Sequence, residues 1–247
     1  MGFGFTGCEL SQWAGNLRSR VGVLNSMTNW RVQLASRGFL LVMALGWVAI
    51  GLASLEYFEP DSVAPFVAER LPVRFESLWL GALQWHVASA IVIFPLCLVL
   101  GTPWLQRRPV WHRSLGRVTG ALVVAVLVPS GIVLSFEAKG GALVTVGFFL
   151  SAAVVLVAMV SGVASARRRD FLAHKRHMLH VTAQMSVAVT SRGLLRGFDM
   201  AGLEPEVAYT VALWIPVVAS ALAAEWLAGR RAFPSFAFTP PVPRSLS

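Results

Sequence analysis

The sequence contains few charged residues and almost no cysteine. Only 13% of its 247 residues are charged and 56% are hydrophobic, whereas a soluble domain carries about 25% charged residues. The two cysteines, Cys8 and Cys97, do not make a disulfide framework, and no CxxCH motif for haem attachment is present. Hydrolase motifs of the G-x-S-x-G or H-E-x-x-H type are also missing. This composition excludes an ordinary soluble domain and indicates an integral membrane protein, and it leaves open whether the protein is an enzyme.

Six apolar runs are long enough to cross the hydrocarbon core of a bilayer, which is about 30 Å thick. A helix rises about 1.5 Å per residue, so roughly 20 residues suffice for one crossing. The sequence therefore predicts an all-α fold, an integral membrane helical bundle of about six transmembrane helices. We expect these spans at 38–55, 78–100, 118–136, 143–166, 178–198 and 206–228.

The segments between the apolar runs alternate in the sign of their charge. Most of the 21 basic residues fall in segments that share one side of the membrane with both termini, and most of the 12 acidic residues fall on the other side. By the positive-inside rule, both termini are then cytoplasmic, and we expect a multi-pass protein of the inner (cytoplasmic) membrane. The net charge of +9 fits attraction to anionic lipid headgroups of the bilayer, and we expect no nucleic-acid partner.

Three regions follow from these patterns. Residues 1–37 form a cytoplasmic or interfacial N-terminal segment, 38–228 form the six-helix transmembrane domain, and the proline-rich residues 229–247 form a disordered C-terminal tail. In the first segment, apolar residues recur at three- and four-residue spacing, as in a helix that lies in the membrane interface. A surface that docks on a partner, in a larger membrane complex or a homo-oligomer, would have the same pattern.

Few polar groups occur inside the spans, and most of them lie in the fifth. At 100° per residue, six of its residues fall on one side of the helix, so we expect a continuous polar stripe that faces protein or water. The stripe consists of His174, His177, His180, Gln184, Ser191 and Arg192. The second span carries His86. Counting residues from the cytoplasmic ends of these two spans predicts that His86 and Arg192 lie at similar depth.

An arginine inside a span is costly, by roughly 2.5–3.5 kcal/mol at the bilayer centre on insertion scales. Three arrangements would relieve this cost for Arg192: an anionic ligand, a carboxylate such as Glu137, or extension of the side chain to the outer headgroups. The first arrangement makes His86, Gln184 and Arg192 candidate ligand-binding residues. They suit a small anionic or lipidic ligand, and His86 with Arg192 would also suit a quinone.

A second polar cluster lies at the cytoplasmic ends of the third and fifth spans. His112 and His174 both precede helices that begin at this face, so they approach each other if the two spans are neighbours. Three interpretations remain open for the cluster, which also contains His180, Arg113 and Arg117. The histidines bind a metal or haem iron, they bind phosphate or lipid headgroups together with the arginines, or they are interfacial polar residues without a ligand.

The motifs around these residues resemble a known family. Trp85-His86, Arg108-x-x-x-His112-Arg113-x-x-Gly116-Arg117, His174-x-x-x-Met178 and Arg192 occur in the order and spacing of the bacterial membrane protein family catalogued as domain of unknown function 2306, over roughly residues 78–197. Members usually carry tryptophan and arginine around the methionine, where this chain has His177 and His180. The resemblance implies a membrane fold and marks these positions as functional, but it implies no reaction.

Histidines on different helices, with arginines available for propionates, are also similar to the haem sites of membrane cytochromes b. The favoured hypothesis is therefore a redox or electron-transfer protein that binds a b-type haem or a quinone within the bundle. Haem ligation by two histidines needs both imidazoles at one height, which only the inner set around His112 and His174 offers. The alternative is a non-redox membrane protein that binds or moves a small anionic or lipidic ligand, or an accessory subunit of a larger membrane complex.

Overall fold

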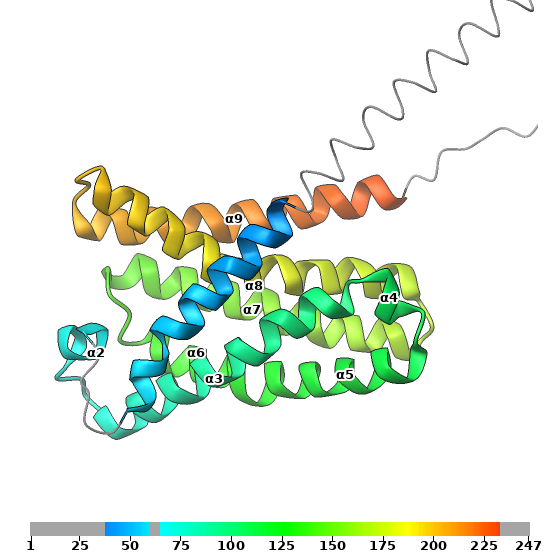
Figure 1. The fold of residues 1–247 in the computed structure, drawn as a ribbon, viewed down its shortest axis with the longest axis horizontal. Coiled ribbons are helices and arrows are strands. Elements are labelled where there is room, and N and C mark those ends of the chain that lie inside the picture. The colour runs from blue at the N-terminus through cyan, green and yellow to red at the C-terminus, as the bar shows by residue number, and fades with distance from the viewer. Residues whose placement is uncertain (1–37, 60–64, 233–247) are drawn as a thin grey trace, which may run out of the picture. The chain divides into compact units, whose positions relative to one another are not determined.

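The computed structural model describes residues 38–59 and 65–232, and all regular elements in these ranges are helices (Figure 1). The chain divides into two units, Met1–Val48 and Ala49–Ser247. The helix Gly38–Phe58 begins in the first unit and ends in the second, and its last turn is the 3-10 helix η1 (Leu55–Phe58). The segment predicted at 1–37 and residues 233–247 of the predicted tail lie outside the described residues.

The second unit continues with a short helix, α2 (Pro65–Arg70), and with the long helices of the bundle. These are α3 (Glu76–Leu100), the continuous helix of α5 (Pro109–Leu122), η2 (Val123–Leu127) and α6 (Val128–Ser135), then α7 (Gly141–Arg167), α8 (Phe171–Met200) and α9 (Pro205–Ala232). A single turn, α4 (Pro103–Gln106), connects α3 to α5. The predicted all-α membrane bundle is confirmed, and α9 continues past residue 228, where we expected the tail to begin.

Five helices of the described chain are both long and apolar enough to be membrane spans: Gly38–Phe58, Glu76–Leu100, Pro109–Ser135, Gly141–Arg167 and Pro205–Gly229. The predicted fifth span, α8, has sufficient length but is too polar to join them. It packs against α7 and α9 more extensively than any other two helices of the described chain pack together. This packing attaches the polar helix to the bundle through one side, on which Val181, Gln184 and Val187 are buried. The count of six spans stays a prediction.

Two helices begin earlier than hydropathy predicts. The third predicted span begins at Pro109 rather than at residue 118, and the fifth begins at Phe171 rather than at 178. Pro109 occupies the first turn of α5, where its missing N–H costs nothing. Asp170 caps α8, because its carboxylate accepts a hydrogen bond from Ala173 N at 3.0 Å. The polar cluster before each apolar run is therefore helical rather than a loop.

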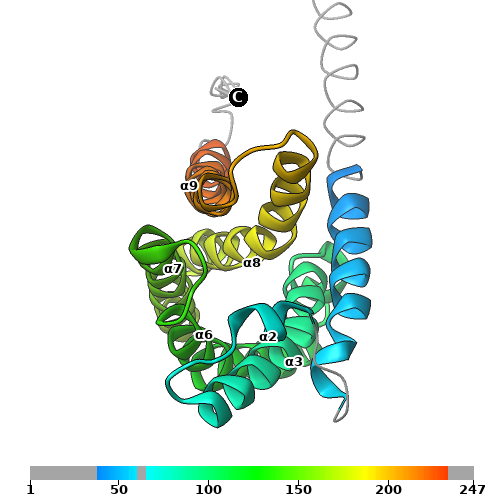
Figure 2. The ribbon, with the colours of Figure 1, turned by 90° about the vertical axis from the view of Figure 1, so that its left-hand side faces the viewer.

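The largest hydrophobic core lies where α3, η2, α7 and α8 meet. Viewed from one end, α3, α6, α7 and α8 follow one another around the second unit, and α9 packs on α7 and α8 (Figure 2). The core residues are Ile93, Cys97, Val123, Leu127, Val128, Val155, Ala158, Met159 and Val181. The segment η2 is a π-helical turn that ends two residues before Pro129. Since proline lacks an N–H and a π-helical turn shifts the hydrogen-bond pattern, the helix ladder is interrupted here, opposite His86.

Candidate functional site

His86 lies on α3 and turns toward this interrupted helix. Its Nδ1 lies 3.2 Å from the carbonyl oxygen of Leu127 and 3.2 Å from Oγ of Ser130. A carbonyl oxygen only accepts, so Nδ1–H is the donor and Nε2 of the neutral ring is left as an acceptor. Gly131 makes room for the ring, because a Cβ atom there would lie 3.1 Å from His86 Cε1. The η2–α6 segment therefore fixes both the position and the tautomer of His86.

Arg192 lies on α8, about 12 Å along the axis from the helix end at Met200. Its Nη1 donates a hydrogen bond to the carbonyl oxygen of Ala188 at 3.0 Å, one turn closer to the middle of the helix. The exposed side chain thus points along α8 toward the middle of the helix, whereas a snorkelling side chain would extend toward the nearest headgroups. Within the described residues this is its only hydrogen bond, and no carboxylate there, Glu137 included, forms an ion pair with it.

Two tyrosines and His86 lie within electrostatic range of the Arg192 guanidinium. Tyr57 of η1 and Tyr209 of α9 lie close enough to interact with it electrostatically, and Arg192 acts in the same way on His86. Lys139, in the turn before α7, lies over the Tyr209 ring at 5.0 Å from its centroid. Residues of four elements, η1, α3, α8 and α9, thus contribute to one cluster. We call His86, Arg192, Tyr57 and Tyr209 the outer cluster.

Gln184, the third residue of the predicted ligand site, has a different environment. Only 3% of it is exposed. Its Oε1 accepts a hydrogen bond from Ser151 Oγ at 3.0 Å, and its Nε2 donates to the carbonyl oxygen of Val217 at 3.1 Å. The amide therefore joins α8 to α7 and α9, and it lies about 12 Å along α8 from Arg192.

His112 of α5 and His174 of α8 approach each other at the opposite end of the bundle, as we expected if their helices were neighbours. Their ring centroids are 6.4 Å apart and their planes make an angle of 82°. His174 Nδ1 is 2.8 Å from the carbonyl oxygen of Gly162, which leaves Nε2 of the neutral ring as an acceptor. His112 Nδ1 is buried and has no hydrogen-bond partner among the described residues. We call these two residues the inner pair.

The H-x-x-x-M motif packs on a single glycine of α7. His174 binds the carbonyl oxygen of Gly162, and Met178 covers its Cα. A Cβ atom at position 162 would collide with the Met178 methyl group and lie 3.1 Å from Cβ of His177. Because residues four apart share a helix face, one glycine receives both ends of the motif. This small residue allows α8 to lie directly against α7.

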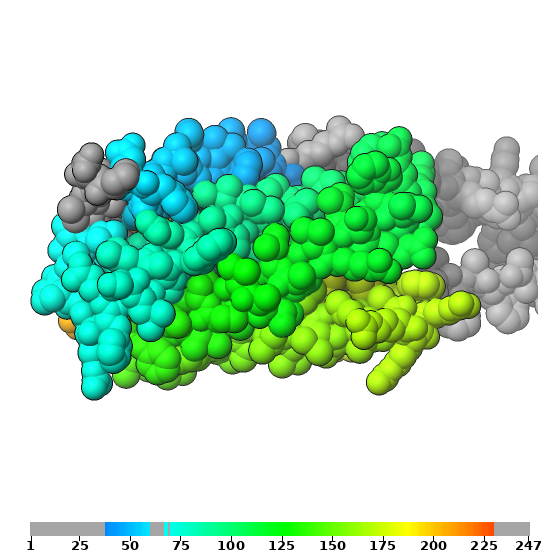
Figure 3. Space-filling view, turned by 90° about the horizontal axis from the view of Figure 1, so that it is seen from below, coloured from blue at the N-terminus to red at the C-terminus, as the bar shows by residue number. Residues whose placement is uncertain are grey.

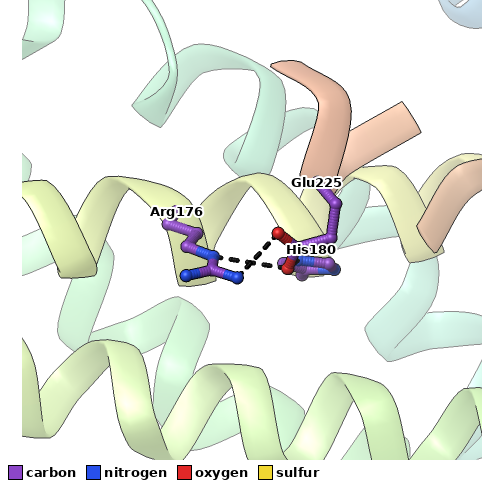
Figure 4. A network of polar contacts seen from close by, with 3 residues as sticks. All are labelled: Arg176, His180 and Glu225. Carbon is purple, nitrogen blue, oxygen red and sulfur yellow. Dashed lines mark hydrogen bonds and ion pairs between the residues drawn. The ribbon is translucent and has the colours of Figure 1, made fainter. Parts of the chain in front are cut away.

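His180 does not join the inner pair. Its Nε2 lies 2.7 Å from Oε1 of Glu225 on α9. Arg176 donates to the same carboxylate from Nη2 at 2.7 Å and from Nε at 3.3 Å, as Figure 4 shows. Within the described ranges no three His, Cys, Asp or Glu side chains are grouped as metal ligands. The predicted trio of His112, His174 and His180 therefore does not assemble, and only the first two meet.

Arg113 and Arg117 lie on α5, close in sequence to His112 and exposed. Arg113 Nε donates a hydrogen bond to the carbonyl oxygen of Pro109 in its own helix at 3.0 Å. Arg117 is about 15 Å along the helix from Leu127, the residue that contacts His86. The two arginines cannot share a small ligand with the outer cluster, so the predicted ligand residues divide between two ends of the bundle.

Sequence patterns do not reveal the tyrosines near Arg192 or the residues that contact His86. No spacing or motif connects Tyr57 or Tyr209 to Arg192. The one feature of the sequence that could have drawn attention to them is that the chain contains only 2 tyrosines. Ser130 and Gly131 are ordinary small residues of a span by composition. Their contacts with His86 depend on the π-helical turn, which hydropathy does not reveal.

Comparison with known proteins matches this part of the chain to one family model. The model is described as "Predicted membrane protein (DUF2306)" and matches residues 83–228. The match confirms the resemblance inferred from the motifs and extends it through most of α9, which includes Tyr209 and Glu225. No curated protein and no solved structure matches the chain.

Proposed function

The chain belongs to this family of predicted membrane proteins (DUF2306), and from that premise we propose that it binds a small anionic ligand within the membrane, at the outer cluster. Arg192 holds the anion, His86 accepts a hydrogen bond through Nε2, and the tyrosines supply hydroxyl groups. A matching ligand carries both a negative oxygen and a proton donor, as a hydroxy acid or a phenolic acid does. The residue types and their convergence from four elements support this class.

The observation that carries the proposal is the orientation of Arg192 toward the middle of α8 without a carboxylate partner in the described chain. Charged side chains inside spans are costly and almost always have a partner. The bond to Ala188, one turn deeper, argues against snorkelling, and Glu137 forms no ion pair with Arg192. A quinone would accept a hydrogen bond from the guanidinium, but its neutral head would leave the charge uncompensated. An anion is therefore the ligand that this geometry favours.

Salicylate binding to the detergent-purified protein tests the proposal. Salicylate carries a carboxylate and a hydroxyl, and salicylamide is its neutral counterpart. We expect titration calorimetry to show that salicylate binds at least about ten-fold more tightly than salicylamide. In Arg192→Leu the affinity for salicylate should fall by a similar factor, because the charge pair is lost. Arg196→Leu is the matched control, since Arg196 lies one turn nearer the end of α8. No salicylate binding, equal binding of the two compounds, or equal losses in the two variants would refute the proposal.

A second candidate is a b-type haem at the inner pair, and the unpartnered Nδ1 of His112 supports it. The rings of His112 and His174 are close, with centroids 6.4 Å apart. His174 is oriented by a backbone carbonyl, as metal-binding histidines almost always are. His112 and His174 would hold the haem, with Arg113 and Arg117 for the propionates. Haem iron supplies one-electron transfer when it is bound.

An absorption spectrum of the purified protein tests this candidate. We expect a Soret band after reduction by dithionite, which His112→Ala and His174→Ala abolish or shift, because each variant removes one of the two histidines that would hold the haem. His86→Ala is the control and should leave the band intact, since His86 lies at the other end of the bundle. A sample without a Soret band would rule out stoichiometric haem and would leave the anion proposal unaffected.

A further inference from the structure

A lateral hollow lies between α7 and α8. It has a volume of about 320 Å³ and is lined by Ala153, Val154, Val157, Ala158, His177 and His180. The wall formed by α7 is apolar, and the wall formed by α8 carries two imidazoles. Ala153 and Val157 are exposed on α7, which is a candidate membrane span. The hollow therefore opens toward surrounding lipid rather than toward the core.

Several basic residues lie in the hairpin that joins α7 to α8. Figure 3 shows this segment in yellow-green at one end of the second unit. Besides Arg176, which is paired with Glu225, the exposed basic residues of this hairpin are Arg167, Arg168, Arg169 and Lys175. None of them forms an ion pair with a carboxylate of residues 38–59 or 65–232. Asp170 caps α8, and Glu225 is already paired with Arg176. The hairpin therefore keeps an excess of positive charge, to which we refer as the basic hairpin.

The distance between the hollow and the basic hairpin matches the dimensions of a phospholipid. Val157 lies about 15 Å along α7 from Arg167, and the hydrocarbon of one leaflet is about 15 Å deep. A phospholipid whose phosphate lies at the hairpin would thus have its acyl chains beside the hollow. His177 lies one turn closer to the hairpin than His180. It can donate a hydrogen bond to ester or phosphate oxygens of the lipid between the hollow and the hairpin. His180 is held by Glu225 and forms part of the wall.

We propose that the hollow and the basic hairpin together bind one anionic phospholipid. An acyl chain fills the hollow against Ala153 and Val157, and the phosphate binds the hairpin arginines and Lys175. Basic pockets between helices at a membrane face recognise anionic headgroups in this way. This site uses no residue of the outer cluster or the inner pair. The lipid proposal is therefore independent of the proposed function.

Native mass spectrometry of the delipidated full-length protein tests the headgroup contact. The probes are phosphatidylglycerol and phosphatidylcholine with the same acyl chains. We expect phosphatidylglycerol to bind about five-fold more tightly, and Arg168→Gln combined with Arg169→Gln to remove this preference. The matched control is Arg107→Gln combined with Arg108→Gln, a basic pair outside the hairpin, which should keep the preference. Equal affinities for the two lipids in the wild-type protein would overturn the proposal.

A second pair of variants tests the hollow. Ala153→Phe fills it and should weaken phosphatidylglycerol binding about five-fold, because the acyl chain loses its contacts. Ala125→Phe is the control, since Ala125 is also an exposed alanine but lines a different hollow, between α3 and the η2–α6 segment. Both changes lie on exposed helix faces, and circular dichroism checks that each variant is folded. Equal losses in the two variants, or no loss in Ala153→Phe, would contradict a bound chain at this place.

Discussion

At Gly162 the backbone of α7 is open to α8, and three side chains of α8 occupy the space. His174 binds the carbonyl oxygen, while His177 and Met178 cover the Cα. This contact needs both the missing Cβ and the four-residue spacing of His174 and Met178. The H-x-x-x-M motif therefore has a packing role at the level of single residues, whether or not the inner pair holds a ligand.

We expect Gly162→Val to lower the free energy of unfolding by about 1–3 kcal/mol, because a larger side chain would overpack this contact. The measurement is reversible unfolding in mixed micelles. Gly193→Ala on α8 serves as the control, since a Cβ atom there meets nothing within 4 Å. That change should be neutral or stabilise the helix by up to about 1 kcal/mol. If the two variants were equally stable, the close approach at Gly162 would not matter for stability.

Among the elements, α8 combines the lowest hydropathy of the long helices with the most extensive packing. Its polar residues find their partners on two neighbours rather than in one cavity. His174 and Gln184 bind α7, while Gln184 and His180 bind α9. The predicted polar stripe thus serves largely to attach α8 between α7 and α9. His177 and Arg192 are exceptions, because neither side chain makes a hydrogen bond to a described residue of α7 or α9.

Much of this arrangement was predictable from the sequence, and the exceptions have physical causes. Apolar runs predicted where the long helices lie, but hydropathy missed the charged first turns of α5 and α8, although Pro109 and Asp170 are known start signals. Counting residues predicted a similar depth for His86 and Arg192, because helix rise is constant. The tyrosines around Arg192 and the π-helical turn were not predictable, since both depend on tertiary contacts between distant segments.

For the whole molecule, the proposed sites lie at both ends of the bundle. The outer cluster is near the end of α8 at Met200, whereas the inner pair and the basic hairpin lie toward its start at Phe171. The orientation of the protein in the membrane determines which face each site lies near. The positive-inside rule predicts that the basic hairpin is cytoplasmic. Only short turns join α8 to α7 and α9, so the number of spans depends on whether α8 crosses the membrane.

Cysteine labelling tests the orientation and the span count together. In a variant with Cys8→Ser and Cys97→Ala, Arg168→Cys and Ala201→Cys each place one thiol at an exposed position, at opposite ends of α8. We expect a membrane-impermeant maleimide to label Ala201→Cys in right-side-out vesicles and Arg168→Cys only in inside-out vesicles. The reason is that basic turns stay on the cytoplasmic side during insertion. Lysed vesicles, in which both thiols should react, are the control for accessibility.

Labelling of both thiols from one side would mean that α8 does not cross the membrane. The chain would then have five spans and its termini would lie on opposite sides. Labelling with the sides exchanged would keep six spans but invert the protein, so the basic hairpin would meet the outer leaflet. The phospholipid at the hollow would then have to come from that leaflet, and the outer cluster would open to the cytoplasm, where its anionic ligand would have to be supplied.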